Sequence, residues 1–146
     1  MLVANPTYYR IDKAVRALPK LTWPLRQTKY TKIIASSDRA YVWRSGPQFG
    51  IIARGTIASG IVPMTLPKEE EPFVRDQTKF PKNVEETGIW FEIEDFLPQC
   101  LTFDVMRANS PELDRLEVVR LKNQTLSRVA PELVSTIDTL YSKANV

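Results

Sequence analysis

Histidine is absent from this sequence, and cysteine occurs once, as Cys100. Histidine is the commonest general base and metal ligand, so its absence excludes a Ser-His-Asp triad, a Cys-His pair and a zinc-dependent base deaminase. A single cysteine forms no intramolecular disulfide and no cysteine-based zinc site. We therefore expect no enzymatic activity, no metal and no cofactor.

Long apolar runs are also missing. No run approaches the roughly 18 residues that a membrane-spanning helix needs, and the first residues do not resemble a signal peptide. Neither common pattern of glycine-rich phosphate loop occurs. The chain has 146 residues, of which 43% are hydrophobic. We expect one domain over residues 1–146 with a sizeable core, in the cytoplasm.

The charge is small in total but uneven along the chain. The net charge is +3, yet residues 1–60 hold ten basic and two acidic residues, a balance of +8. Residues 61–146 hold ten basic and fifteen acidic residues, a balance of −5. This asymmetry favours a basic face that binds a polyanion such as nucleic acid, although an ordinary solvated surface is the alternative.

Hydrophobic periodicity predicts short strands and a few helices. A strand is expected at 2–4, and apolar residues at helical spacing predict a helix at 11–18. Strict alternation at 39–45 predicts a strand with Tyr41 and Trp43 on one face and Ala40 and Val42 on the other. A turn at Gly46-Pro47 leads to an antiparallel partner at 49–58, where Gly50 and Gly55 indicate a bulge or a barrel corner.

The second half of the chain is less regular. Residues 65–82 contain three prolines, so we expect a mobile surface loop outside the core. Residues 88–93 alternate like a strand, and Pro131 begins a terminal helix. About five short strands with flanking helices predict an α+β fold built on a small, partly closed barrel.

One stretch carries a family resemblance. It opens with Trp23-Pro24 before a basic segment, continues through the strand at 39–45 and the Ser45-Gly46-Pro47 turn, and ends in the strand at 49–58. This arrangement resembles an EVE domain, a member of the PUA-like superfamily related to the YTH readers of methylated adenine. The resemblance implies a PUA-like small mixed β-barrel with flanking helices. It also implies recognition of a modified base flipped out of nucleic acid, DNA more than RNA, with a separately encoded nuclease as a plausible partner.

The resemblance also assigns site residues. Trp23 would stack on the base, with Phe96 or Trp43 opposite. The polar edge of the base would contact Asn5, Gln27, Ser45, Asn123 and Gln124. The flanking phosphates would contact basic residues in the first third of the chain, namely Arg10, Arg26, Lys29, Lys32 and Arg44.

Trp23 has a particular expected position. It precedes a proline, which favours an extended backbone, and its neighbours Thr22, Arg26 and Gln27 are polar. We therefore expect it at the rim of a pocket, where an alanine would cost little stability.

Two features depart from the family pattern. EVE domains usually have Gly-Asp at the turn before the first long strand, whereas this chain has Ser37-Asp38. The polar segment that closes the pocket commonly contains Thr-Asn-Phe, which is missing from this chain.

Other functions fit parts of the sequence. A PUA-like domain that binds RNA in translation or RNA modification would share the basic face. A nucleoside or nucleotide sensor would use the same aromatic slot. A magnesium-dependent nuclease would use the carboxylates of Glu92, Glu94 and Asp95, although a solvated strand face explains these residues more simply.

Overall fold

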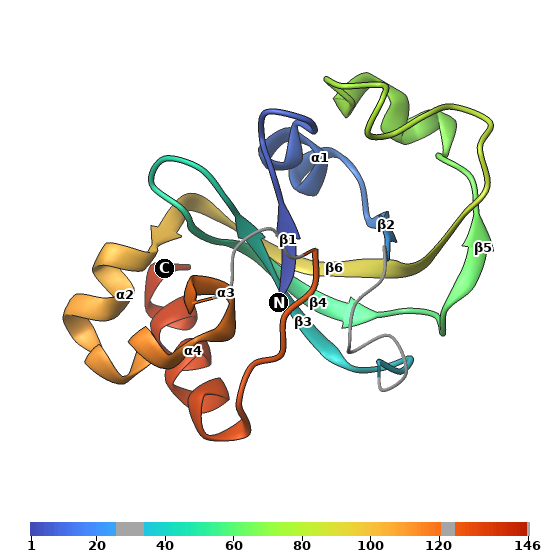
Figure 1. The fold of residues 1–146 in the computed structure, drawn as a ribbon. Helices are drawn as coiled ribbons and strands as arrows, with labels where there is room; N and C mark the ends of the chain where they lie inside the picture. The colour runs from blue at the N-terminus through green and yellow to red at the C-terminus, as the bar shows by residue number, and fades with distance from the viewer. Residues whose placement is uncertain (26–33, 121–124, 146) are drawn as a thin grey trace.

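The computed structural model describes residues 1–25, 34–120 and 125–145. These residues form a six-stranded mixed sheet in the order β1-β3-β4-β6-β2, with β5 paired to β6. The strands are β1 (Leu2–Ala4), β2 (Lys20–Pro24), β3 (Arg39–Arg44), β4 (Gly50–Ile57), β5 (Val62–Met64) and β6 (Glu86–Thr102). Among the strand pairs of the described residues, β1 and β3 alone run parallel, with Leu2 beside Val42. The sheet curls into a nearly closed barrel, and its end strands are β1 and β2 (Figure 1).

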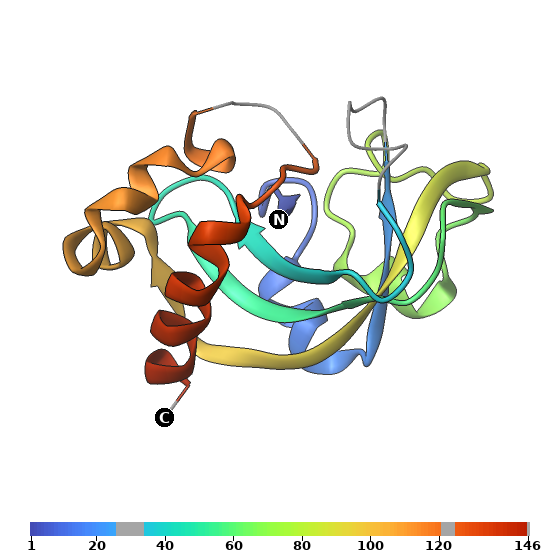
Figure 2. The same cartoon turned by 90° about the horizontal axis from the view of Figure 1, so that it is seen from below.

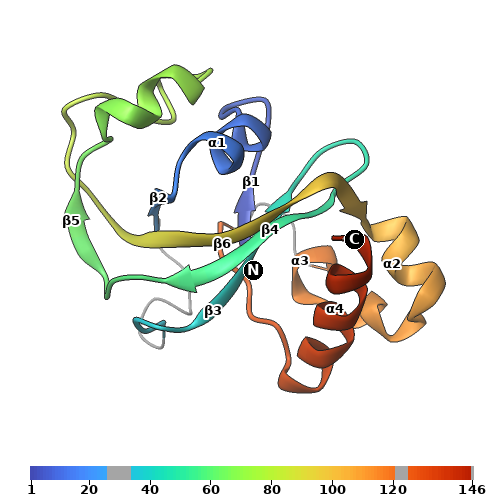
Figure 3. The same ribbon diagram turned by 180° about the vertical axis from the view of Figure 1, so that it is seen from behind.

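Helices flank the sheet. α1 (Ile11–Ala17) and the 3-10 helix η1 (Lys68–Phe73) lie at one end, while α2 (Phe103–Asn109), α3 (Glu117–Arg120) and α4 (Pro131–Ala144) gather at the other (Figures 1 and 3). A second 3-10 helix, η2 (Pro111–Arg115), joins α2 to α3. Within the described part of the chain, no helix is long and apolar enough to cross a bilayer. This architecture confirms the predicted α+β fold with a small barrel and flanking helices.

The two faces of β3 belong to two hydrophobic clusters. Ala40 and Val42 pack in a cluster that includes Leu2, Trp23 and α1, while Tyr41 and Trp43 pack in a second cluster with α2 and α4. Figure 2 shows β3, β4 and β6 curving past the C-terminal helices. The alternation read from the sequence is therefore confirmed, because successive strand side chains point to opposite faces.

Close backbone contacts fix two glycines of β4. A Cβ built on Gly50 would lie 2.1 Å from the carbonyl oxygen of Leu101, and one on Gly55 would lie 1.9 Å from that of Glu92. The register between β4 and β6 shifts between Ile51 and Ala53 and again between Arg54 and Gly55. The predicted bulge at these glycines is confirmed, and it adds curvature to the sheet.

The largest correction concerns residues 65–82. We expected a mobile loop outside the core, but Glu70 in η1 is buried, and Phe73, Val74 and Phe80 pack against the first cluster. The backbone N–H of Arg10 donates to the carbonyl of Phe73 at 2.6 Å. The prolines keep the segment out of the sheet without keeping it out of the core, and the prediction of a mobile loop is wrong.

Other elements extend beyond their predicted bounds. The strand expected at 88–93 is the middle of β6, which spans Glu86–Thr102 because β2, β4 and β5 all pair along it. Such a long strand is not visible as one alternating run, since its burial pattern changes where its partners change.

Glu70 anchors the segment 65–82 to the barrel. Its carboxylate accepts hydrogen bonds from the Tyr9 hydroxyl (2.8 Å), the Thr22 hydroxyl (2.7 Å) and the Thr22 backbone N–H (2.9 Å). Burial raises the pKa of the Glu70 carboxyl above its ordinary value, because desolvation outweighs these hydrogen bonds. The raised pKa means that the protonated form is favoured by folding.

Two variants test the anchor. We expect Glu70→Ala to lower the free energy of unfolding by about 1–3 kcal/mol, because it leaves the buried Thr22 N–H without an acceptor. Glu70→Gln keeps an acceptor for Thr22 and a donor for Tyr9, but it does not titrate. Because the pKa of Glu70 is raised in the folded protein, the protonated carboxyl stabilises the fold. This contribution to the free energy of unfolding is complete below the unfolded pKa and is lost as pH rises through the folded pKa. Urea unfolding from about pH 4 to about pH 8 should therefore show that the free energy of unfolding of Glu70→Gln rises relative to that of the wild type as pH increases. A constant difference would contradict this.

Ser37 adopts the left-handed conformation, with φ of 76°, at the turn where the resemblance expects glycine. Its backbone N–H donates to the carbonyl of Ile57 at 2.7 Å, and the carboxylate of Asp38 accepts from the N–H of Ala35 at 2.8 Å. Ser37 therefore adopts a backbone conformation that glycine tolerates better than serine does.

We expect Ser37→Gly to raise the free energy of unfolding by about 0.5–1 kcal/mol, because it relieves the left-handed strain that a side chain causes. The matched control is Ser36→Gly, at a neighbouring residue without positive φ, which should lower stability because of the added freedom of the unfolded chain. Thermal or urea unfolding measures both, and the same sign for both variants would contradict the explanation.

Candidate functional site

A cavity of about 640 Å³ lies where the barrel does not close. The end of β1 lines one side with Ala4 and Asn5, and β2 lines the other with residues 21–24. The remaining walls come from α1 and from the segments around Tyr8, Ser45, Lys79 and Val118. Because β1 and β2 are the two ends of the sheet, the gap between them provides an opening into the barrel.

Two tryptophans from different strands line this cavity. Trp23 belongs to β2 and packs edge-on against Phe91, with ring centroids 6.3 Å apart. Trp43 belongs to β3, and its ring centroid lies 5.8 Å from that of Phe49, whose side chain is 38% exposed. Phe49 stacks in turn on Phe103 at 5.7 Å. Several aromatic rings around one cavity suit a flat, π-rich ligand.

Polar groups surround the aromatic rings. The side-chain oxygen of Asn5 accepts from the Thr7 N–H at 2.9 Å, which fixes the turn after β1. The Ser45 hydroxyl donates to the carbonyl of Ala4 at 3.1 Å and thereby ties β3 to β1. Both side chains line the cavity, so the Asn5 amide NH₂ and the Ser45 oxygen lone pairs provide one donor and one acceptor site.

The predicted aromatic residues differ in their positions. Trp23 and Trp43 line the cavity, whereas Phe96 lies outside it. Phe96 lies on β6, where it pairs with Ala53 of β4. Its side chain is exposed, and the guanidinium of Arg16 lies 5.3 Å from its ring centroid. Phe96 is therefore not the ring opposite Trp23, because β6 continues well beyond the point where we expected it to end.

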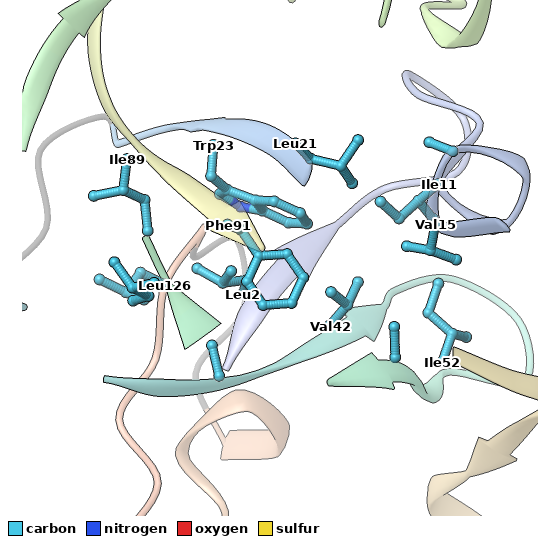
Figure 4. Packing of buried hydrophobic residues seen from close by; sticks show 14 of the residues in the cluster. Leu2, Ile11, Val15, Leu21, Trp23, Val42, Ile52, Ile89, Phe91 and Leu126 are labelled. Atoms are coloured by element: carbon cyan, nitrogen blue, oxygen red, sulfur yellow. The ribbon is translucent and has the colours of Figure 1, made fainter. Parts of the chain in front are cut away.

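Trp23 is not a rim residue. It is 7% exposed and points into the core toward Phe91 and Leu2 (Figure 4). The expected extended backbone is confirmed, since Trp23 lies in β2 beside Ile89. The polar neighbours were misleading because Thr22 faces the buried carboxylate of Glu70 rather than solvent.

The predicted phosphate residues are only partly described. Arg44 pairs with Asp12 of α1 at 3.1 Å and donates to the carbonyl of Gln48 at 3.2 Å, so its charge is already neutralised within the protein. Arg10 is exposed and directly follows Tyr9, which lines the cavity. Residues that lie outside the described part of the chain are Gln27, Asn123, Gln124, Arg26, Lys29 and Lys32.

Sequence reasoning missed several lining residues, namely Tyr8, Tyr9, Phe49, Phe80 and Lys79. Tyr8 and Tyr9 follow the Asn5-Pro6 turn, and this turn was the available signal that they stay near the end of β1. Phe80 and Lys79 gave no comparable signal, since they belong to the segment that we expected to be mobile.

One of the three acidic residues expected to form a metal site, Asp95 of β6, takes part in the packing of the fold. Asp95 accepts from the Tyr141 hydroxyl at 2.6 Å and pairs with Arg54 at 3.3 Å, which attaches α4 to the sheet. Across residues 1–25, 34–120 and 125–145, no group of three or more His, Cys, Asp or Glu side chains is placed to hold a metal ion. The arrangement gives no support to the magnesium-nuclease alternative.

Solved structures share this architecture at low sequence identity. A protein from Pseudomonas syringae is 18% identical, with a TM-score of 0.63 over 95% of this chain and 96% of that chain. The DUF55 domain of human thymocyte nuclear protein 1 is 8% identical, with a TM-score of 0.59 over 88% and 84%. This chain has a DUF55-type fold. These structures confirm the fold predicted from the sequence, a small mixed barrel with flanking helices.

A third structure has the same DUF55-type fold. Human THYN1, solved in complex with DNA containing 5-methylcytosine, is 9% identical, with a TM-score of 0.64 over 99% of this chain and 96% of that chain. Neither models of protein families nor curated proteins match the sequence. The likeness therefore establishes the fold, and the function has to be argued from the cavity.

The burial of Trp23 reverses the expected cost of replacing it. We expect Trp23→Ala to lower the free energy of unfolding by about 3–5 kcal/mol, as for a buried aromatic residue. Phe49→Ala, at a partly exposed ring on the same cavity, should cost clearly less. Chemical denaturation measures the loss in free energy of unfolding for both variants. A loss for Trp23→Ala as small as that for Phe49→Ala would indicate that Trp23 lies at the rim of the pocket after all.

Proposed function

We propose that this chain binds a modified base flipped out of a DNA strand and holds it in the cavity between β1 and β2. The observation that carries the proposal is that Trp23 and Trp43, from two different strands, line one opening of about 640 Å³. A volume of this order lies within the range of small-molecule sites. Extrusion leaves both faces of a base to be covered, and aromatic walls do this.

The energetics require a further contribution. Stacking on an aromatic ring is worth about 1–3 kcal/mol per base, and flipping costs a few kcal/mol. Stacking with the hydrogen bonds that Asn5 and Ser45 offer therefore roughly offsets extrusion. The net binding free energy therefore has to come from phosphate contacts, so binding should weaken as salt concentration rises.

The THYN1 structure supports the choice of DNA. That protein was solved with DNA containing 5-methylcytosine, and it has the fold of this chain over almost its whole length. We extend the proposal to a binding module without catalytic activity, because the chain has no histidine to act as general base. A separately encoded nuclease as partner stays a prediction of the family resemblance.

Phe49 is the residue on which to test the proposal, because its exposed ring lines the cavity without being buried in the core. We expect Phe49→Ala to weaken binding of a modified oligonucleotide by about 5- to 150-fold, which corresponds to about 1–3 kcal/mol of stacking. The matched control is Phe96→Ala, which removes a phenylalanine of the same 38% exposure outside the cavity. Fluorescence anisotropy with labelled DNA measures both.

The same titrations decide between ligand classes. Modified and unmodified versions of one DNA sequence, the corresponding RNA and free nucleosides are compared. Equal losses in Phe49→Ala and Phe96→Ala, or equal affinity of the wild type for modified and unmodified DNA, would contradict base reading in this cavity. Tighter binding of RNA or of a nucleoside would favour the RNA-binding or sensor alternative.

A further inference from the structure

The segment from Arg75 to Phe80, named the strap here, lies against the mouth of the cavity. Its backbone is fixed at Tyr8, whose carbonyl accepts from the N–H groups of Arg75 (2.9 Å) and Asp76 (3.1 Å). Next to this contact, Val74 forms an antiparallel bridge with Tyr9. Since Tyr8 and Tyr9 both line the cavity, these bonds attach the strap to the wall itself.

Side chains continue the attachment. The ring of Phe80 lies 5.2 Å from that of Tyr9, and the ammonium group of Lys79 lies 5.3 Å from the centre of the Tyr8 ring. Lys79 and Phe80 both line the cavity. The cation of Lys79 is therefore held beside an aromatic wall at the opening, although it belongs to the half of the sequence with a net negative charge.

The acidic residue of the strap, Asp76, forms hydrogen bonds within the strap. The carboxylate of Asp76 accepts from the backbone N–H and the hydroxyl of Thr78, at 2.9 and 2.5 Å. These hydrogen bonds lower the pKa of Asp76. Its charge thus stabilises the turn that presents Lys79, while Arg75 and Lys79 are exposed on either side of it.

We propose that Arg75 and Lys79 bind the nucleic-acid phosphates that flank a base held in the cavity. The proposal rests on the proposed function and adds a phosphate-binding element to that site. A flipped nucleotide keeps its two phosphates, so a base in the cavity brings two anionic groups to its mouth. Because the backbone that carries these two cations is already anchored there, binding phosphate does not require the segment to be ordered first. Arg44, which the resemblance assigned to phosphate, is held by Asp12 instead.

The test compares two double variants of equal charge. Arg75→Gln with Lys79→Gln removes the strap cations and keeps both backbone donors. Lys68→Gln with Lys143→Gln removes two exposed lysines that do not line the cavity. Affinity for a modified and an unmodified DNA duplex is measured by anisotropy over a series of salt concentrations. Thermal unfolding verifies that each variant is folded.

We expect the strap variant to bind both duplexes more weakly. The slope of log affinity against log salt should flatten by about 1.8, since each lost phosphate contact contributes about 0.9. The control variant should keep the slope within a few tenths of the wild-type value. Lys79→Arg, which keeps the charge, should bind like the wild type.

Failure of the strap and failure of the base pocket give different results. A strap variant that keeps the wild-type slope, or a control variant that loses as much, overturns the phosphate role of Arg75 and Lys79. If the wild type still prefers modified DNA in that case, the proposed function stands. A flattened slope in the strap variant, without any preference for modified DNA, supports the phosphate element and contradicts base reading.

Discussion

The buried carboxylate of Glu70 is the interaction on which the site depends. It accepts the backbone N–H of Thr22, a donor on the edge of β2 that has no strand beside it, and the hydroxyls of Thr22 and Tyr9. An edge strand with unpaired backbone groups invites pairing with another strand. Glu70 satisfies this donor with a side chain, so β2 is stabilised as an edge and the barrel stays open. The cost is a buried acid with a raised pKa.

The opening and its walls follow from that arrangement. Because β1 and β2 do not pair, a cavity lies between them, and aromatic residues from several elements line it. Glu70 also fixes η1, from which the chain continues to the strap, so Lys79 and Phe80 reach the mouth. Through its hydrogen bonds to Tyr9 and Thr22, the buried Glu70 thus attaches the segment that ends at the cavity mouth to the core of the barrel. At the other end of the molecule, Asp95 attaches α4 through Tyr141.

Net charge along the sequence was an imperfect guide to charge in space. The basic first part of the chain contains Arg44, which Asp12 neutralises within the protein. The acidic second part contains Lys79, which lines the cavity. It also contains Asp95, which forms an ion pair with Arg54 and accepts a hydrogen bond from Tyr141. Electrostatic readings from composition assume that neighbours in sequence share a face. Here the segment 65–82 crosses to the side of Tyr8 and Tyr9, and this mixing occurs only in the folded chain.

The sequence by itself determined the alternation of β3, the bulge in the strand that carries Gly50 and Gly55, the helix that begins at Pro131 and the class of fold. These depend on local periodicity and backbone sterics, which a short window contains. Tertiary structure alone decided that Trp23 is buried, that Phe96 lies outside the cavity and that Phe49 and Lys79 line it. The burial of Thr22, beside Trp23, depends on Glu70, 48 positions later, which accepts hydrogen bonds from its backbone N–H and its hydroxyl. No local pattern encodes such a partner, because a carboxylate is ordinarily exposed unless distant donors satisfy it.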